Sequence, residues 1–185
     1  MVTRTRFEEL ALPLKDAAYN LAYWIVRNRD DAEDVVQDAY LRAFRAFAGF
    51  KGDAMRPWLL AIVRNAAYRA LQDRRRAGNV VSLDEVFAVH GAVDGHDIAS
   101  SDPTAEAMVI ADDEGRQLYA ALAELPAAYR DIVVLRELEG LAYSEIAAIA
   151  GVAIGTVMSR LSRGRALLRK SIERRMMTKG ERDAM

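Results

Sequence analysis

The chain has 185 residues, of which 52% are hydrophobic and 29% are charged, so it is long enough for one domain or two small ones and can bury a core. It contains no cysteine, which excludes disulfides, cysteine nucleophiles and thiolate metal sites and fits a reducing cytoplasm. No uncharged apolar run reaches about 18 residues, so we expect a cytoplasmic protein with no membrane insertion.

The formal net charge of −1 hides an uneven distribution of charge. Residues 81–115 contain nine Asp and Glu residues and no Lys or Arg, whereas the segments before and after them are mildly basic. The average charge alone argues against a nucleic-acid-binding protein, but the two basic segments keep that class open.

Two amphipathic helices are predicted early in the chain. Apolar residues recur at helical spacing over residues 17–26 and again over residues 32–47. Between these stripes, either Asp30 or Asp31 suits the N-cap of the second helix.

A loop and a third helix complete the first basic segment. Residues 50–53 form a glycine-bearing loop, and Pro57 suits the first turn of a helix that runs to about Arg74. The helical pattern then dissolves over residues 77–102, where glycine punctuates the chain and acidic residues dominate its charge. This stretch is predicted to be a flexible acidic linker.

Four more helices are predicted after the linker. The first two lie on either side of Pro126, and Gly140 closes the second. Ser144 suits the N-cap of a short third helix that ends at Gly151. The four predicted ranges are 104–125, 127–139, 145–150 and 154–176.

The chain is therefore predicted to be all-α, with two small helical domains joined by a flexible acidic linker, the C-terminal one a helix-turn-helix. No alternating strand pattern is visible in the sequence. The predicted boundaries are 1–78 for the N-terminal domain, 79–103 for the linker, 104–176 for the C-terminal domain and 177–185 for a polar, frayed tail.

Ala147, Gly151 and Val157 have the spacing of a helix-turn-helix. A small residue lets the second helix cross closely, a glycine takes the positive φ of the turn, and a branched residue packs inward. The opposite face carries hydroxyls and arginines, which suit base edges and phosphates in a major groove. An ordinary helical hairpin with a solvated basic face fits the spacing too, but the density of arginine favours DNA. The candidate contacts are Thr156, Ser159, Arg160, Arg163 and Arg165.

Three stretches of sequence resemble one known family. LPAAYRDIVVLRELEGLAYSEIAAIAGVAIGTVMSRLSRGRALLRK (125–170) is similar to the promoter-recognising C-terminal domain of extracytoplasmic-function (ECF) sigma factors of the sigma-70 family. DAEDVVQDAYLRAF (31–44) and PWLLAIVRNAAYRALQDRRR (57–76) resemble the N-terminal domain of the same family.

The resemblance implies a non-enzymatic transcription initiation factor without a cofactor, acting in a stress or envelope response. Such a protein binds core RNA polymerase and directs it to promoters. Its C-terminal domain reads the minus-thirty-five element as duplex, and its N-terminal domain melts and holds the minus-ten element. The resemblance also implies an anti-sigma factor as a partner.

The family resemblance assigns roles to two sets of N-terminal residues. An acid-amide-acid face suits a basic coiled coil of the polymerase, although such a face is also typical of any solvated helix. The loop before Pro57 and the helix after it supply positive charge, an amide and aromatic rings, which a melted single strand requires. The expected polymerase contacts are Asp34, Gln37, Asp38, Leu41 and Arg45. The expected minus-ten contacts are Phe50, Lys51, Asp53, Arg64, Asn65, Tyr68 and Arg69.

Three alternatives remain open from the residues alone. One is a stand-alone helix-turn-helix regulator that binds operator DNA. Another is a helical module that acts only through interactions with other proteins, which leaves the arginine-rich face unexplained. The third is a helical enzyme with a carboxylate metal site, but the Glu-x-x-His pairs that such bundles use are missing, and His90 and His96 lack a third ligand. That metal site would be built from Asp30, Asp31, Glu33, Asp34 and Asp38.

Overall fold

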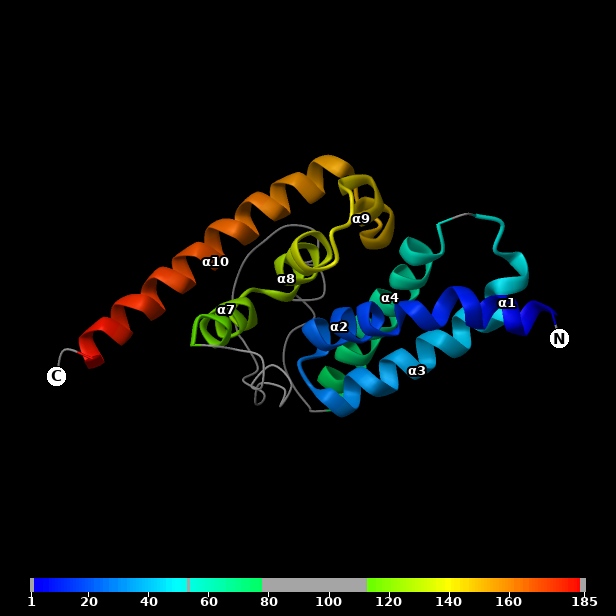
Figure 1. Ribbon diagram of the computed structural model, residues 1–185, viewed down its shortest axis with the longest axis horizontal. Coiled ribbons are helices and arrows are strands. Elements are labelled where there is room, and N and C mark those ends of the chain that lie inside the picture. Colours follow the sequence, from blue (N-terminus) through cyan, green and yellow to red (C-terminus); the bar gives the residue numbers. More distant parts are fainter. Residues whose placement is uncertain (1, 53, 78–112, 184–185) are drawn as a thin grey trace.

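The computed structural model describes residues 2–52, 54–77 and 113–183, and every regular element within them is helical (Figure 1). The all-α prediction with two helical domains is confirmed. The acidic linker, with His90 and His96, lies outside the described residues, as does Asp53. In the described part of the chain, no single helix is long and apolar enough to cross a membrane. The helices α9 (Tyr143–Ala150) and α10 (Ile154–Asp183) are apolar enough only together, and they meet at a 100° bend.

The N-terminal domain is a bundle built around α2, α3 and α4. Its long helices turn their apolar stripes inward, and Leu21, Ile25, Leu59 and Val63 are fully or almost fully buried. Burial of such side chains is the main stabilising contribution to a bundle of this size. The elements are α1 (Val2–Ala11), the 3-10 turn Leu12–Leu14, α2 (Lys15–Val26), α3 (Arg29–Ala46), the 3-10 turn Phe47–Gly49 and α4 (Met55–Ala77).

The N-cap of α3 is Asn28, not Asp30 or Asp31 as predicted. Asn28 has an extended backbone, and its side-chain oxygen accepts a hydrogen bond from the Asp31 N–H at 3.0 Å. The two aspartates lie in the first turn, where their negative charges interact favourably with the positive end of the helix dipole. Pro57 lies in the first turn of α4, as predicted.

The C-terminal domain consists of shorter helices and one long one. Its elements are α7 (Asp113–Ala123), α8 (Ala127–Val133), the π-helical turn Val134–Leu138, α9 (Tyr143–Ala150) and α10 (Ile154–Asp183). Helix α7 is the part of the predicted helix 104–125 that the structure describes. Residues 104–112 lie outside the described residues. The predicted helix 127–139 is α8 continued by the π-helical turn, and Gly140 closes it with a φ of +66°.

Two boundaries in this domain differ from the predictions. The N-cap of α9 is Ala142, not Ser144, because the Glu145 side chain reaches back and accepts a hydrogen bond from the Ala142 N–H at 2.7 Å. Helix α10 continues to Asp183, past the predicted end at residue 176 and through most of the predicted tail. No proline interrupts it, and Glu124 at the end of α7 accepts hydrogen bonds from three of its side chains, Ser171, Arg174 and Arg175.

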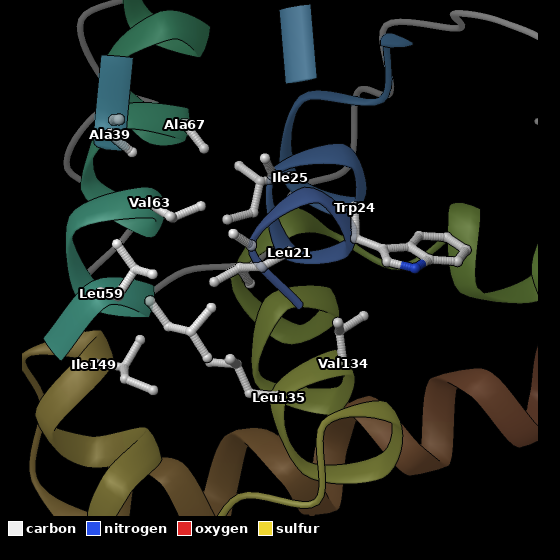
Figure 2. Packing of buried hydrophobic residues seen from close by; sticks show 14 of the residues in the cluster. Leu21, Trp24, Ile25, Ala39, Leu59, Val63, Ala67, Val134, Leu135 and Ile149 are labelled. Carbon is white, nitrogen blue, oxygen red and sulfur yellow. The ribbon is translucent and has the colours of Figure 1, made fainter. Parts of the chain in front are cut away.

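The two domains share one hydrophobic core (Figure 2). Helix α8 lies against α2, and α9 lies against α4. Leu135 and Ile149 of the C-terminal domain face Leu21, Leu59 and Val63 of the N-terminal domain. The sequence leaves the relative orientation of the domains open, so this closed arrangement is a finding of the structure.

Candidate nucleic-acid interface

The helix-turn-helix has the geometry that its sequence predicts. Gly151 ends α9 with a φ of +66°, which an L side chain rarely adopts. Val157 is fully buried, and Ala147 is buried beneath the crossing. Helix α10 therefore leaves the turn with its inner face fixed against α8 and α9.

The inner face of α10 packs closely against α8 at Gly164. A Cβ atom there would lie 2.8 Å from Cγ2 of Val133 in α8. Only a glycine permits this separation without a shift of the neighbouring helix. The close approach fixes the rotation of α10 and hence the direction of its outer face.

The outer face of α10 holds the residues predicted to contact duplex DNA. Ser159 and Arg163 are exposed, and Thr156 and Arg160 are partly buried. The Ser159 hydroxyl donates to the Thr156 carbonyl oxygen at 3.0 Å, which holds it close to the helix. The structure thus brings four of the five predicted residues to one accessible face near the start of the helix.

Arg165, the fifth predicted residue, forms an ion pair with a carboxylate of the same domain. Its Nε and Nη2 donate to Glu137 Oε1 at 3.0 and 2.6 Å, so the guanidinium lies over the π-helical turn. The hydrogen bond with Glu137 and the charge of that carboxylate raise the pKa of Arg165. Arg165 remains exposed, and its guanidinium is directed at Glu137.

The predicted polymerase contacts lie on the solvent face of α3. Asp34, Gln37 and Arg45 are exposed, and Leu41 is 57% exposed. Asp38 is partly exposed and accepts a hydrogen bond from Arg42 Nε at 2.6 Å. All five residues face away from the buried stripe of the same helix, as expected from their spacing.

The loop that joins α3 to α4 is anchored by aromatic packing. Phe50 is partly buried, with ring centroids 5.9 Å from Phe47 and 4.8 Å from Trp58. Lys51 beside it is exposed, and Asp53, the third predicted residue of this loop, lies outside the described residues. The geometry gives Phe50 a structural contact in addition to its predicted contact with DNA.

The four predicted contacts on α4 divide into two pairs. Asn65 and Arg69 are exposed. Arg64, which is only 8% exposed, and Tyr68 instead face the C-terminal domain. Both donate to Oδ2 of the fully buried Asp131 in α8, Arg64 through Nε at 2.8 Å and Tyr68 through its hydroxyl at 2.9 Å.

Burial and charge shift the pKa values of these two donors. Burial raises the pKa of Tyr68 well above its ordinary value, and the Asp131 charge raises it further. Burial opposes the charged form of Arg64, but its pKa is raised because the charge and hydrogen bonds of Asp131 and Tyr68 more than compensate. Tyr68 is therefore a neutral donor and Arg64 a permanently charged one.

Further polar contacts cross between the domains. Arg130 Nη1 donates to the Trp24 carbonyl oxygen at 3.0 Å, and the Arg56 guanidinium lies 2.7 Å from the Glu139 carboxylate. Sequence reasoning missed Arg130 and Asp131. The signal was present, because two charged residues inside the apolar run LPAAYRDIVVL require partners once that run is buried.

No group of three or more His, Asp or Glu residues in the described ranges is arranged to hold a metal ion. The carboxylates considered for a metal site on α3 point to solvent or pair with arginines, as Asp31 does with Arg74 at 2.7 Å.

Comparisons with known proteins agree with this geometry. Residues 10–77 match the family Sigma-70 region 2, and residues 115–168 match the family Sigma-70, region 4. The first match covers the bundle that carries the α3 and α4 faces, and the second covers the helix-turn-helix.

Curated relatives match over most of the chain. The ECF RNA polymerase sigma factor SigE of Mycolicibacterium smegmatis is 36% identical over 163 residues, which are 88% of this chain, and this chain spans 60% of its length. The RNA polymerase sigma-H factor of Pseudomonas aeruginosa is 31% identical, with 90% of this chain and 86% of that protein covered. The ECF RNA polymerase sigma-E factor of Escherichia coli is 33% identical, with 77% and 74% covered.

Solved structures show the same arrangement of helices. The sigma factor RpoE of Bartonella quintana, in complex with the anti-sigma factor NepR, matches with a TM-score of 0.67 and 28% identity over 91% of this chain and 97% of that one. CnrH, in complex with the cytosolic domain of CnrY, matches with a TM-score of 0.63 and 23% identity over 92% and 89%, which supports the fold alone.

Proposed function

The chain belongs to the ECF sigma factors of the sigma-70 family, and on that premise we propose that it reads promoters through the outer face of α10 and the surface of α4. Sigma factors of this family direct RNA polymerase to promoters and are not enzymes. The observation that carries the proposal is the exposed hydroxyl and arginine face of a helix-turn-helix whose rotation is fixed by packing.

Helix α10 is proposed to enter the major groove of the minus-thirty-five element. Arg163 is exposed and long enough to reach base edges, where arginine pairs with guanine through two hydrogen bonds. Thr156, Ser159 and Arg160 supply further contacts to bases or phosphates. Arg165 contributes a phosphate contact only if it leaves Glu137.

The loop and α4 are proposed to hold the melted minus-ten strand. Lys51, Asn65 and Arg69 are exposed and offer charge and an amide to the backbone and bases of that strand. The remaining proposed contacts are Phe50, Asp53, Arg64 and Tyr68.

The solvent face of α3 is proposed to bind core RNA polymerase. The joint replacement Asp34→Asn and Asp38→Asn removes two acceptors of charge-assisted hydrogen bonds, so we expect weaker capture of core polymerase in a pull-down. Binding of the variant to minus-thirty-five duplex should be unchanged. Undiminished capture of core polymerase would contradict this assignment.

The partners and setting follow from the same premise. An anti-sigma factor is a proposed partner. The proposal is supported by the Bartonella sigma factor RpoE, which is similar to this chain in fold and sequence and is in complex with the anti-sigma factor NepR. The cytoplasm is the proposed location, because the polymerase and the promoters are there. The proposed domain limits are residues 1–78 and 104–176, with the linker at 79–103, and α10 extends the second domain to Asp183. A stress or envelope response is the proposed trigger.

The experiment that tests this function is transcription with core polymerase lacking any sigma factor. The purified chain and core polymerase are mixed with a library of genomic promoter fragments, and the 5′ ends of the transcripts are sequenced. We expect discrete start sites that share a two-element upstream motif. If the chain produces no start sites and does not bind core polymerase, a stand-alone helix-turn-helix regulator is favoured instead.

A further inference from the structure

Asp131 accepts hydrogen bonds from two side chains that are proposed to bind DNA. The carboxylate belongs to α8 in the C-terminal domain, whereas Arg64 and Tyr68 belong to α4 in the N-terminal domain. Its Oδ2 accepts from both of them, and its Oδ1 accepts from the Ile132 N–H at 2.7 Å. The carboxylate has no exposed surface, so water does not compete for its oxygens.

A carboxylate and a DNA phosphate offer the same chemistry to a guanidinium. Both are anions that accept short charge-assisted hydrogen bonds. Arg64 is buried in this interface, with its Nε directed at Asp131 and its Nη1 3.5 Å from the Ala150 carbonyl oxygen. A strand of DNA therefore cannot reach Arg64 while Asp131 holds it.

The contact belongs to a continuous interface. Beside it, Leu135 and Ile149 pack against α2 and α4 in the shared core, and the Arg130–Trp24 hydrogen bond and the Arg56–Glu139 ion pair lie in the same boundary between the domains. A buried charge is tolerated when its partners are fixed in this way. The domains cannot separate without exposing Asp131 and releasing Arg64 together.

We propose that Asp131 acts as an internal mimic of a DNA phosphate, which closes the free chain by holding Arg64 and Tyr68 away from single-stranded DNA. The proposal rests on the proposed function of α4 as the surface for the melted strand. When the domains separate, Arg64 and Tyr68 lose the Asp131 carboxylate and become available to a phosphate of the DNA strand. The outer face of α10 lies outside the contact, so the closed chain still presents its duplex-reading residues.

Energy transfer between two dyes tests the closure directly. The chain has no cysteine, so Lys15→Cys on α2 and Glu173→Cys on α10, both exposed positions, accept the dyes without other changes. Asp131→Asn keeps the shape of the side chain but removes its charge. We expect one closed population in the parent chain and at least a tenfold larger open fraction in Asp131→Asn.

The matched control is Asp31→Asn, which breaks an ion pair with Arg74 inside the N-terminal domain. This variant should remain as closed as the parent chain. Equal transfer in Asp131→Asn and the parent chain would overturn the proposal.

A second readout measures the competition for Arg64. Anisotropy of a fluorescein-labelled single-stranded oligonucleotide of mixed sequence reports binding to the full chain at low salt. We expect Asp131→Asn to bind it at least fivefold more tightly than the parent chain, and Arg64→Ala in the Asp131→Asn background to remove that gain. Opening without tighter binding would overturn the competition, whereas the transcription assay would still test the sigma function separately.

A cross-linked variant keeps the test valid if Asp131→Asn fails to fold. Arg56→Cys and Glu139→Cys replace an ion pair across the interface, and a short bis-maleimide joins the two thiols. The cross-linked chain should bind the oligonucleotide at least tenfold more weakly than the same variant before cross-linking. Equal binding before and after cross-linking would overturn the proposal.

Discussion

The residues proposed to contact DNA on α10 and on α4 have similar chemistry but different accessibility. On α10, Ser159 and Arg163 are exposed while the inner face is fixed by packing. On α4, Arg64 and Tyr68 are turned into the boundary between the domains and hydrogen-bonded to Asp131. The comparison shows that residue type identifies a candidate contact, whereas tertiary packing decides whether DNA can reach it.

The largest expected effect comes from breaking the buried pair on its α4 side. Arg64→Ala leaves the Asp131 carboxylate buried without its cation, which should destabilise the closed arrangement by about 3–5 kcal/mol. Urea titration followed by Trp24 fluorescence in a Trp58→Phe background reports this, because Trp24 packs on Tyr119 across the boundary. We expect the domains to separate at a lower urea concentration.

The control for this prediction is Arg69→Ala, which changes an exposed arginine on the same helix. Its urea curve should superimpose on that of the parent chain. An Arg64→Ala curve that also superimposes would remove the distinction between the two arginines.

The accessible face of α10 depends on the close approach at Gly164. Gly164→Ala places a methyl group against Val133 and should destabilise the C-terminal domain by about 1–3 kcal/mol through overpacking. Gly155→Ala is the matched control, because nothing lies within 4 Å of a Cβ atom there. It should be neutral or gain up to about 1 kcal/mol from helix propensity. Thermal unfolding measured by circular dichroism checks both variants, and equal losses would contradict the packing argument.

The exposed arginine on α10 is expected to affect DNA binding and not stability. Arg163→Ala should weaken binding to the minus-thirty-five duplex by about 1–3 kcal/mol if the side chain reads a base. The duplex is taken from the mapped promoters, and binding is measured by anisotropy against a scrambled duplex. Equal losses on both duplexes would assign Arg163 to a phosphate instead.

The smallest expected effect comes from the neutral donor of the α4 pair. Tyr68→Phe removes one hydrogen bond to Asp131 and should destabilise the closed arrangement by about 1 kcal/mol. Because the Tyr68 pKa is raised in the folded chain, its contribution is complete below the ordinary tyrosine value of 10.0 and is lost as the pH rises through the higher folded value. Urea unfolding at pH 8 and above pH 10 should show the difference between the two chains shrinking, and a constant difference would contradict the hydrogen bond.

Much of the local structure follows from sequence pattern alone. The apolar stripe of α3, the turn at Gly151 and the inward position of Val157 are dictated by helical periodicity and by the positive φ that glycine permits. The solvent face of α3 follows for the same reason, because residues opposite a buried stripe are exposed.

Long-range contacts were not predictable in the same way. Asp131 is separated from Arg64 by 67 positions, and nothing local in the sequence pairs them. The cap at Asn28 was missed because three neighbouring residues all suit the position, and only backbone geometry decides between them. The pairing of Arg165 with Glu137 likewise depends on the π-helical turn, and the sequence of that turn does not predict its π-helical geometry.

The most direct test of the contrast between the two surfaces is the nitrogen-15 NMR spectrum of arginine Nε–H groups in the free full-length chain. The Arg64 resonance, assigned by its loss in Arg64→Lys, should exchange slowly with solvent because it is buried against Asp131. It should become fast in Asp131→Asn, whereas the Arg163 resonance should be fast in both chains. An Arg64 resonance that exchanges as rapidly as that of Arg163 in the parent chain would contradict the account.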